Sequence, residues 1–293
     1  MNHSYDFAII GGDMRQAYLA KELADCNFRV CYYALCKEAD LHALLTRSSA
    51  TSASSLSEAC DASCIVCPIP LCKNGTLLNQ TAQKEELPVN AVLSYINADQ
   101  FFFAGCIPND VQAKAVEKGA VVHDLMQDMR LSYFNTIATA EGAVCEAIAR
   151  SPVNLRKSSC AVIGYGKCGK TICQYLTGML CHVCVIAEPE LELAEAATVA
   201  ETTGNFSYFK EAAGQFDFIF NTVPVPIIDA DILKSVKRTT TIIDIASPPG
   251  GIDYDAANEF QTHAVLCPGL PGKYAPYSSA KAIMETIKSI LKE

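Results

Sequence analysis

Short apolar runs alternate with amphipathic stretches along the whole chain, and this alternation sets the expected fold. In the first half, six apolar runs of strand length are separated mostly by helical patterns. Such an alternation predicts βαβ units that build a parallel sheet. The strands are expected at YDFAII, FRVCYY, ASCIVC, AVLSYI, FFFAG and AVVHDL.

A second series of strands follows a polar break near the middle of the chain. Residues 135–150 place apolar side chains at helical spacing, so we expect one helix that ends near Arg150. The next segment, SPVNLRKSS, is polar, and we place the domain boundary at about residue 151. Five later runs, CAVIG, VCVIA, FDFIFN, TTTIIDIA and HAVLC, predict a second parallel sheet.

Two other segments complete the expected architecture. The small, Ser-rich segment Thr46 to Ser63 is typical of an exposed connection. Near the C-terminus, Ile283, Ile287 and Leu291 recur every four residues, which predicts an amphipathic helix that packs back on the first domain. The fold class is therefore α/β, with two Rossmann-like doubly wound domains over residues 1–150 and 151–275 and a returning helix over 276–293.

Composition and charge narrow the functional classes. The chain has 293 residues, half of them apolar, and a net charge of −9 without a basic stripe, which argues against nucleic-acid binding. Its apolar runs are too short for a membrane-spanning helix, which needs about 20 residues. The N-terminus shows no export signal, so we expect a cytoplasmic protein.

Fifteen cysteines raise the question of a metal or disulfide framework. Two CxxC spacings occur, Cys64 to Cys67 and Cys181 to Cys184, and both lie in expected strands. Positions i and i+3 of a strand face opposite sides of a sheet, so neither pair can share one metal. We expect no metal site and interpret the cysteines as small buried apolar residues.

The segment GYGKCG matches GxGxxG with Gly164, Gly166 and Gly169. An expected strand leads into it, and an amphipathic helix begins near Lys167. In this setting the first glycine makes the turn, the second lets the backbone approach a pyrophosphate, and the third lets the helix pack on the sheet. The motif predicts a nicotinamide dinucleotide site.

Glu188 bears on the choice of cofactor. It ends the next expected strand, 24 positions after Gly164, near the spacing of about 20 residues at which an acidic side chain meets the ribose 2′-hydroxyl. A carboxylate there would repel a 2′-phosphate, which favours NAD(H) over NADP(H). The alternative is that Glu188 only caps the following helix.

Polar side chains also follow later strands of the same domain. Ligands bind outside the carboxyl ends of strands in open parallel sheets, so the ends near Asn221 and Asp244 should face the same crevice as the glycine loop. The predicted cofactor-binding residues are Gly164, Tyr165, Gly166, Lys167, Cys168, Gly169, Glu188, Asn221, Thr222, Val223, Pro224, Asp244 and Ala246.

The substrate side is expected from GGDMRQ, after the first strand, and from CPGLPGKYAP. Arg15 offers a fork that suits a carboxylate, although it could equally be a surface residue. None of the five histidines forms a recognisable dyad with an acidic residue in the sequence, which argues against a histidine base of the kind used in 2-hydroxy acid dehydrogenases.

Six segments together resemble the A subunit of bacterial dipicolinate synthase in order and spacing: IIGGDMRQ, NTIATAEGA, VIGYGKCG, NTVP, DIASPPGGID and PGLPGKYAP. The resemblance spans nearly the whole chain. It implies a formate/glycerate dehydrogenase-like pair of domains, oxidation of dihydrodipicolinate to dipicolinate with NAD(P)+, a flavoprotein-like B subunit, and a role in sporulation in the mother-cell cytoplasm. A homo-oligomer is also expected. The resemblance implies Arg at the position of Glu188 in some relatives, so NADP(H) stays open.

The resemblance also assigns candidate site residues. Because aromatisation drives the reaction, hydride alignment and a proton acceptor should suffice. We expect Glu141 to accept the proton, with Thr139 and Asn135 as orienting groups, and Arg15 to hold a substrate carboxylate. The predicted substrate-binding residues are Gly12, Asp13, Arg15, Ser247, Gly250, Gly251, Gly269, Leu270, Pro271 and Lys273. The alternatives are a dehydrogenase of another small carboxylate and a non-catalytic dinucleotide-binding scaffold for the B subunit.

Overall fold

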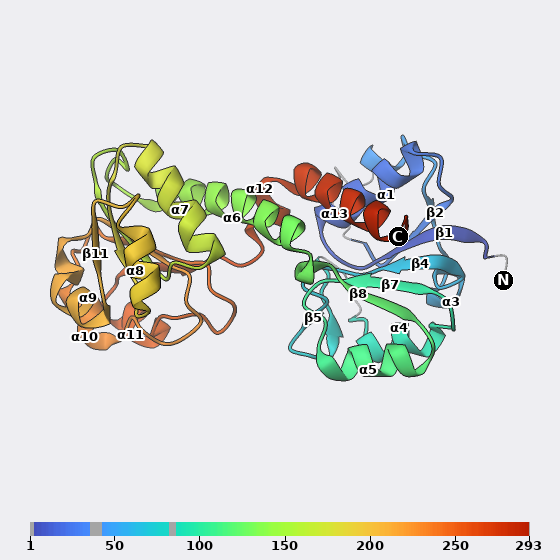
Figure 1. Ribbon diagram of the computed structural model, residues 1–293. Coiled ribbons are helices and arrows are strands. Elements are labelled where there is room, and N and C mark those ends of the chain that lie inside the picture. The colour runs from blue at the N-terminus through green and yellow to red at the C-terminus, as the bar shows by residue number, and fades with distance from the viewer. Residues whose placement is uncertain (1–2, 36–42, 82–85, 293) are drawn as a thin grey trace. The chain divides into compact units, whose positions relative to one another are not determined.

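The computed structural model describes residues 3–35, 43–81 and 86–292, and the chain divides into two compact units (Figure 1). The first unit comprises residues 1–134 and 275–293, and the second comprises residues 135–274. Each unit contains its own six-stranded sheet. The prediction of two Rossmann-like α/β domains is therefore confirmed.

All neighbouring strands in the sheet of the first unit are parallel, in the order β3-β2-β1-β4-β7-β8. Phe7 of β1 pairs with Val30 on one side and with Cys64 on the other, so the three carboxyl ends meet at one edge. The strands are β1 (Tyr5–Ile10), β2 (Val30–Tyr33), β3 (Thr51–Ser52), β4 (Ala62–Val66), β7 (Phe101–Ala104) and β8 (Val121–Asp124), and β5 (Cys72–Lys73) and β6 (Leu77–Leu78) form a separate antiparallel pair.

Helices cover both faces of this sheet. One face packs against α1 (Met14–Asp25) and α13 (Pro276–Ile290), and buried Ile283 and Ile287 of α13 share a core cluster with Leu19 and Leu23 of α1. The C-terminal helix therefore belongs to the first unit, as the sequence predicted. The other face packs against α3 (Leu56–Ala59), α4 (Val89–Tyr95) and α5 (Asn109–Glu117), and η1 (Leu125–Gln127) follows β8.

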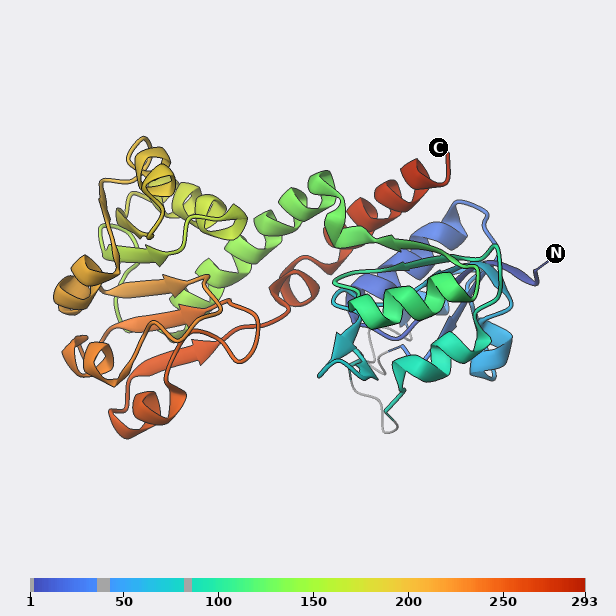
Figure 2. The same cartoon turned by 60° about the horizontal axis from the view of Figure 1, so that its bottom comes forward.

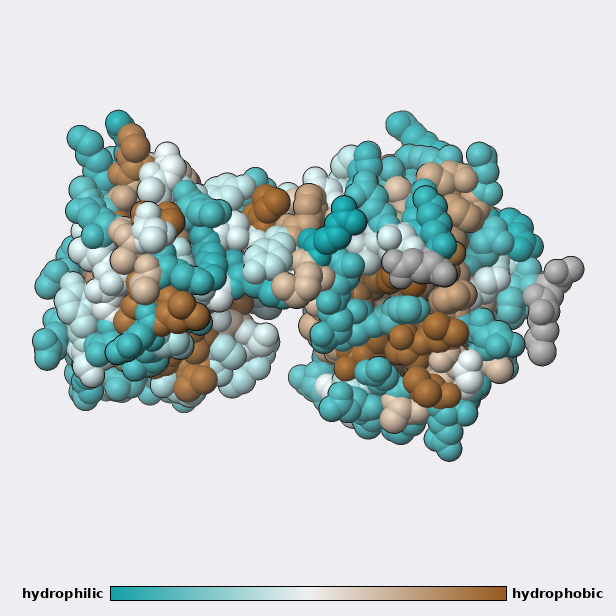
Figure 3. Space-filling model, in the orientation of Figure 1, coloured by the Kyte–Doolittle hydropathy of each residue, from teal (hydrophilic) through white to brown (hydrophobic). Residues whose placement is uncertain are grey.

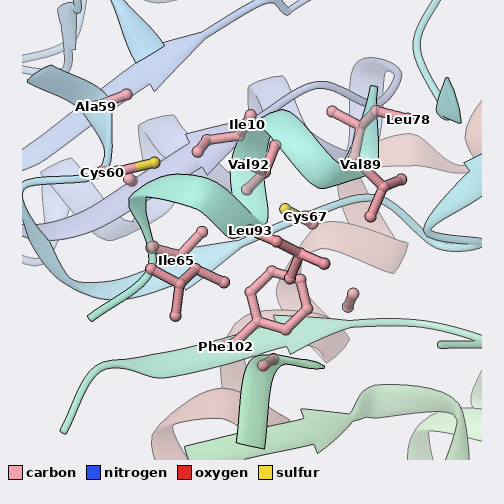
Figure 4. Close-up of a cluster of buried hydrophobic side chains, with 14 of the residues drawn as sticks. Ile10, Ala59, Cys60, Ile65, Cys67, Leu78, Val89, Val92, Leu93 and Phe102 are labelled. Carbon is pink, nitrogen blue, oxygen red and sulfur yellow. The ribbon is translucent and has the colours of Figure 1, made fainter. Parts of the chain in front are cut away.

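The prediction of a strand at AVLSYI was wrong, because this segment lies in helix α4. Pro88 is its N-cap, and Val89, Val92 and Leu93 are buried at helical spacing. Figure 4 shows these side chains in the same cluster as Phe102 of the sheet. A short apolar run with β-branched residues fits either element, and tertiary packing decides between them.

The prediction of an exposed connection over Thr46 to Ser63 was also wrong in part. This stretch contains strand β3 and helix α3, which Ser55 caps by accepting a hydrogen bond from the backbone N–H of Glu58. Leu56 and Ala59 are buried in the core. Most of the serines are exposed and one of them forms the cap, while the alanines between them are buried.

The second unit repeats the same strand order, β11-β10-β9-β12-β13-β14, and all neighbours are parallel. Figure 2 shows its strands with helices on both sides. The order reverses at β9, the position where open α/β sheets leave a crevice for ligands. The strands are β9 (Ser159–Ile163), β10 (His182–Ile186), β11 (Thr202–Gly204), β12 (Phe218–Asn221), β13 (Thr241–Asp244) and β14 (His263–Leu266).

The helices of the second unit divide between the two faces of its sheet. Core residues place α6, α7, α8 and α12 on one face and α9, α10 and α11 on the other. The helices are α6 (Met129–Arg150), α7 (Lys167–Gly178), α8 (Glu190–Ala196), α9 (Phe206–Ala212), η2 (Ala213–Gln215), α10 (Ala230–Ser235), α11 (Tyr254–Glu259) and α12 (Leu270–Tyr274).

The division between the units lies at residues 134 and 135, earlier than the boundary expected at residue 151. Helix α6 ends at Arg150 as predicted. However, Ala140, Ala143 and Ala147 of this helix are buried in the core of the second unit. The sequence boundary was set at the end of the helix, whereas packing assigns most of the helix to the domain that follows.

The two cysteines of each CxxC pair lie on opposite sides of their sheet, as predicted. Cys64 and Cys67 belong to different core clusters of the first unit, and Cys181 and Cys184 belong to different clusters of the second. Within the described ranges, no helix is both long and apolar enough to cross a bilayer. Figure 3 shows hydrophilic residues interspersed with apolar patches on the surface of both units.

Candidate functional site

The glycine loop between β9 and α7 is the centre of the candidate site. Gly164 has φ of +87°, and a Cβ there would lie 2.5 Å from Oγ1 of Thr222. A Cβ on Gly169 would lie 2.0 Å from the carbonyl oxygen of Gly164, whereas one on Gly166 would meet nothing within 4 Å. Close packing within the protein therefore requires glycine at positions 164 and 169, whereas Gly166 leaves room for a ligand.

The start of helix α7 is suited to an anion. Its N-cap is Gly166, which is exposed and supplies no side-chain cap. The first N–H groups of a helix point outward and carry partial positive charge, so a phosphate at this end is stabilised. The structure thus places the predicted pyrophosphate loop at a helix start that no side chain covers with a cap.

The corresponding turn of the first unit is closed by its own side chains. Asp13 caps α1 by accepting a hydrogen bond from the backbone N–H of Arg15, and Gln16 accepts one from the backbone N–H of Asp13. A carboxylate therefore already occupies the start of α1. The turn at Gly166 differs from it, because its N-cap has no side chain that could accept a hydrogen bond from the first turn of α7.

The loop after β12 lies against the glycine loop. The hydroxyl of Thr222 donates a hydrogen bond to the carbonyl oxygen of Ile163 at 2.8 Å, and a Cβ on Gly164 would lie 2.7 Å from Cγ2 of Val223. Asn221 is fully buried, and its Nδ2 donates to the carbonyl oxygen of Val223 at 3.0 Å. The predicted cofactor residues of both loops are thus brought together.

Asp244, at the end of β13, organises the next loop. Its carboxylate is fully buried and accepts four hydrogen bonds, from Nδ2 of Asn221, the backbone N–H groups of Ala246 and Gly251, and the hydroxyl of Tyr254, at 2.8 to 3.0 Å. Burial, followed by the negative charge of Asp244, raises the pKa of Tyr254, which stays a donor. With four donors on its two oxygens, Asp244 acts by shaping the loop.

That loop contains several predicted substrate residues. Ser247 is exposed, and Gly250 has φ of +89° with its Cβ position 2.5 Å from Oδ2 of Asp244. A Cβ on Gly251 would lie 2.4 Å from Nδ2 of Asn221. The two glycines therefore let the loop close over the buried carboxylate, and Ser247 is left at its surface.

Glu188 is placed at the strand end that the sequence predicted. The backbone N–H of Gly164 donates to the carbonyl oxygen of Ile186 at 2.8 Å, so the end of β10 lies beside the glycine loop. Glu188 follows two residues later and is exposed. Its Oε1 accepts a hydrogen bond from the backbone N–H of Phe206 at 3.0 Å, which holds the carboxylate near the start of α9.

Arg15 is 5% exposed, so the alternative of a surface residue was wrong. Its Nε and Nη2 bind the carboxylate of Asp13 at 3.0 and 2.8 Å, and Nη2 also donates to the carbonyl oxygen of Ile69 at 2.5 Å. Nη1 of the guanidinium takes no part in these hydrogen bonds. A substrate carboxylate would therefore meet a cation that is already paired, and the binding role of Arg15 stays a prediction.

The predicted catalytic residues lie on different faces of α6. Glu141 is exposed, and its Oε1 accepts a hydrogen bond from the hydroxyl of Tyr175 at 3.0 Å. Thr139 is buried, and its hydroxyl donates to the carbonyl oxygen of Asn135 in the preceding turn. Their spacing of two residues points their side chains in different directions on a helix.

Glu146 is a buried carboxylate that the sequence analysis missed. It is 3% exposed and accepts hydrogen bonds from Nζ of Lys273 at 2.5 Å and from the hydroxyl of Tyr274 at 2.6 Å, while Arg150 pairs with its other oxygen at 2.7 Å. Burial opposes ionisation, but these three partners lower the pKa of Glu146 overall. The ammonium of Lys273, predicted for substrate, is thus engaged by this carboxylate.

Three further predicted substrate residues, Gly269, Leu270 and Pro271, follow β14. Leu270 and Pro271 are buried, and Gly269 is exposed with φ of +68°. A Cβ on Gly142 of α6 would lie 2.9 Å from Cβ of Leu270, so α12 packs closely on that helix. In the sequence, the glycine at position 142 within an otherwise helical segment indicates such a contact, because glycine permits a close approach.

Comparison with known proteins adds a family to this geometry. Residues 6–126 match the family of N-terminal domains of the dipicolinate synthase A subunit. The A subunit of dipicolinate synthase from Bacillus subtilis (strain 168) is 31% identical over 163 residues, a match that covers 56% of this chain and 55% of the relative. The sequence match thus spans about half the length of that curated relative.

Solved structures extend the similarity of fold to almost the whole chain. The A subunit of dipicolinate synthase from Bacillus halodurans superposes with a TM-score of 0.82 at 22% identity, over 98% of this chain and 97% of that one. An L-alanine dehydrogenase superposes with a TM-score of 0.63 at 11% identity, over 97% and 88%. The fold is therefore one shared with a dehydrogenase. The predicted likeness of the chain to the A subunit of dipicolinate synthase is therefore confirmed, by the family match over residues 6–126, by the curated relative and by the superposed structure.

Proposed function

We propose that the second unit binds a nicotinamide dinucleotide at the glycine loop and that the chain uses it to oxidise dihydrodipicolinate to dipicolinate. The observation that carries the first part is the start of α7, where Gly166 leaves open space and no side chain caps the helix. This start lies where the strand order reverses, which favours a ligand at the same place.

The proposed reaction balances without another reactant. When bound, the oxidised dinucleotide supplies the acceptor for a hydride, so dihydrodipicolinate loses a hydride and a proton and becomes the aromatic dipicolinate. Aromatisation favours this step, and the main task of the protein is to position the ring against the acceptor. This demand agrees with a site that has no histidine and acid pair among its predicted residues.

Within this proposal, Glu141 is the acceptor of the proton. Its exposed carboxylate can pass the proton to water, and the hydrogen bond from Tyr175 holds it in one orientation. Asn135 and Thr139, four residues apart, share a face of α6 that differs from that of Glu141, and the hydroxyl of Thr139 is bonded to the carbonyl oxygen of Asn135, so this proposal does not keep them as orienting groups. Arg15 and Ser247 belong to the substrate side. The pairing of Arg15 with Asp13 gives the substrate carboxylate a fixed rather than a mobile cation to bind.

NAD(H) is the proposed cofactor because of Glu188. Its exposed carboxylate at the end of β10 would accept a hydrogen bond from the ribose 2′-hydroxyl and repel a 2′-phosphate. Initial rates with NAD+ and NADP+ at equal concentrations test this assignment. A strong preference for NADP+ would overturn it without affecting the proposed reaction.

We also propose a partner and a setting from the resemblance. The relatives are named as A subunits, which supports a complex with a flavoprotein-like B subunit of dipicolinate synthase. Sporulation, in the mother-cell cytoplasm, is the proposed setting.

The direct test is an assay of the purified chain for dipicolinate, by its ultraviolet absorbance, from freshly prepared dihydrodipicolinate and NAD+ or NADP+. We expect formation of dipicolinate together with an equal amount of reduced cofactor. Turnover of other small carboxylates alone would favour a different dehydrogenase. Binding of dinucleotide without turnover, with or without the B subunit, would favour a scaffold.

A further inference from the structure

Helix α8 presents an acidic side chain to the glycine loop. Oε2 of Glu192 accepts a long hydrogen bond, 3.3 Å, from the backbone N–H of Tyr165, which is the residue between the first two glycines of the motif. Tyr165 is 5% exposed and Glu192 is half-buried. A carboxylate of the protein thus binds one N–H donor of the loop proposed to hold the pyrophosphate.

A second contact holds α8 in this place. Nζ of Lys170 on α7 pairs with Oε2 of Glu195 at 2.5 Å, and the same ammonium lies 5.5 Å from the centre of the Tyr165 ring. Glu192 and Glu195 are three residues apart and share one face of the helix. The ion pair therefore keeps the face that carries Glu192 turned toward α7 and its loop.

A dinucleotide brings negative charge to the same loop. Its phosphates are stabilised by the start of α7, but they are repelled by a carboxylate only a few ångströms from the loop. The N–H of Tyr165 is also a single donor, so it cannot bind the carboxylate of Glu192 and a phosphate oxygen equally well at the same time. The carboxylate of Glu192 and the ligand therefore oppose each other.

We propose that Glu192 competes with the dinucleotide for the glycine loop and so sets the affinity of the chain for its cofactor. This inference rests on the proposed function of the second unit and adds a residue that lowers affinity to those that raise it. In the cofactor-free chain the carboxylate satisfies the N–H of Tyr165. Binding of the dinucleotide displaces the carboxylate toward solvent, so a part of the binding energy is used to move it.

Two substitutions separate the charge from the hydrogen bond. Glu192→Gln keeps an acceptor of the same length for the N–H of Tyr165 and removes the charge. Glu192→Ala removes both. Glu190→Gln is the matched control, because Glu190 is an exposed acidic residue in the first turn of the same helix. All three leave the pair of Lys170 and Glu195 in place.

The experiment is a titration of the full chain with NADH, in which binding is measured by calorimetry and by the fluorescence of the reduced nicotinamide. We expect Glu192→Gln to bind NADH about 3- to 10-fold more tightly than the wild type, which is the range of one hydrogen bond or charge contact, and Glu192→Ala to gain at least as much. Glu190→Gln should change the affinity by less than about twofold.

The possible outcomes distinguish a failure of this inference from a failure of the proposed function. Wild-type affinity in both Glu192 variants would overturn the competition. Weaker binding in both would also overturn it and would show that Glu192 holds the cofactor. If none of the four proteins binds NADH, the proposed cofactor site itself is wrong, and the inference falls with it.

Discussion

Replacing Gly169 by alanine should force the start of α7 away from the end of β9. The added Cβ would lie 2.0 Å from the carbonyl oxygen of Gly164 and 2.9 Å from its carbonyl carbon. Both contacts are with backbone, so no side chain can rotate out of the way. The helix and the loop must move apart by about 1.4 Å to reach the 3.4 Å at which ordinary contact begins.

The magnitude follows from two opposing effects. Overpacking costs about 1–3 kcal/mol, and the rigid contact places this change at the upper end. Alanine gains about 1 kcal/mol over glycine in helix propensity. The net loss is therefore about 2 kcal/mol in the free energy of unfolding, equivalent to a fall of roughly 4–8 °C in Tm.

Differential scanning calorimetry measures this loss, because it can resolve the transitions of two units. Gly166→Ala is the control, since a Cβ there meets nothing within 4 Å. Its weaker capping and the lower entropy of its unfolded chain nearly cancel, so we expect a change within about 1 kcal/mol. Equal Tm values for Gly169→Ala and the wild type would refute the packing role of this glycine.

Two further predictions concern buried carboxylates. Asp244→Asn turns an amide NH2 toward hydrogen-bond donors in the shell of Asp244, and it should lower the free energy of unfolding in urea by about 2–3 kcal/mol. A loss below about 0.5 kcal/mol would contradict the organising role of Asp244. For Glu146, the lowered pKa in the folded chain means that its contribution to stability is present above the usual value of 4.5 and is lost as the pH falls through the folded-state pKa. Glu146→Gln should therefore flatten the fall in stability below about pH 4.5, and an unchanged pH profile of Tm would count against this pairing.

The sequence predicted those features of the fold that depend on local pattern. Buried parallel strands appear as apolar runs, and ten of the eleven expected runs contain a strand of the structure. The prediction for AVLSYI was wrong because β-branched residues such as Val92 suit a strand as well as a helix, and only packing on Phe102 and its neighbours decides. The boundary expected at residue 151 differs from the division at residues 134 and 135 because the packing of Ala140 and Ala147 is not visible in a helical pattern alone.

The candidate site shows the same division between local and distant contacts. The glycine loop could be predicted because the turn, the helix start and the packing glycine lie within six residues. The partners of Arg15 and Lys273 could not, because Ile69 lies 54 residues from Arg15 and Glu146 lies 127 residues from Lys273. The contact of Glu192 with Tyr165, which crosses 27 residues, was missed for the same reason.

The central claim is that the loop around Gly166 binds a nicotinamide dinucleotide. Titration of the purified chain with NADH, compared between the wild type and Gly166→Ala, tests it most directly. The structure predicts saturable binding of one NADH per wild-type chain, and loss of at least tenfold in affinity in a variant that stays folded, because the Cβ enters the space proposed for the pyrophosphate. No binding by the wild type, or equal binding by both proteins, would contradict the claim.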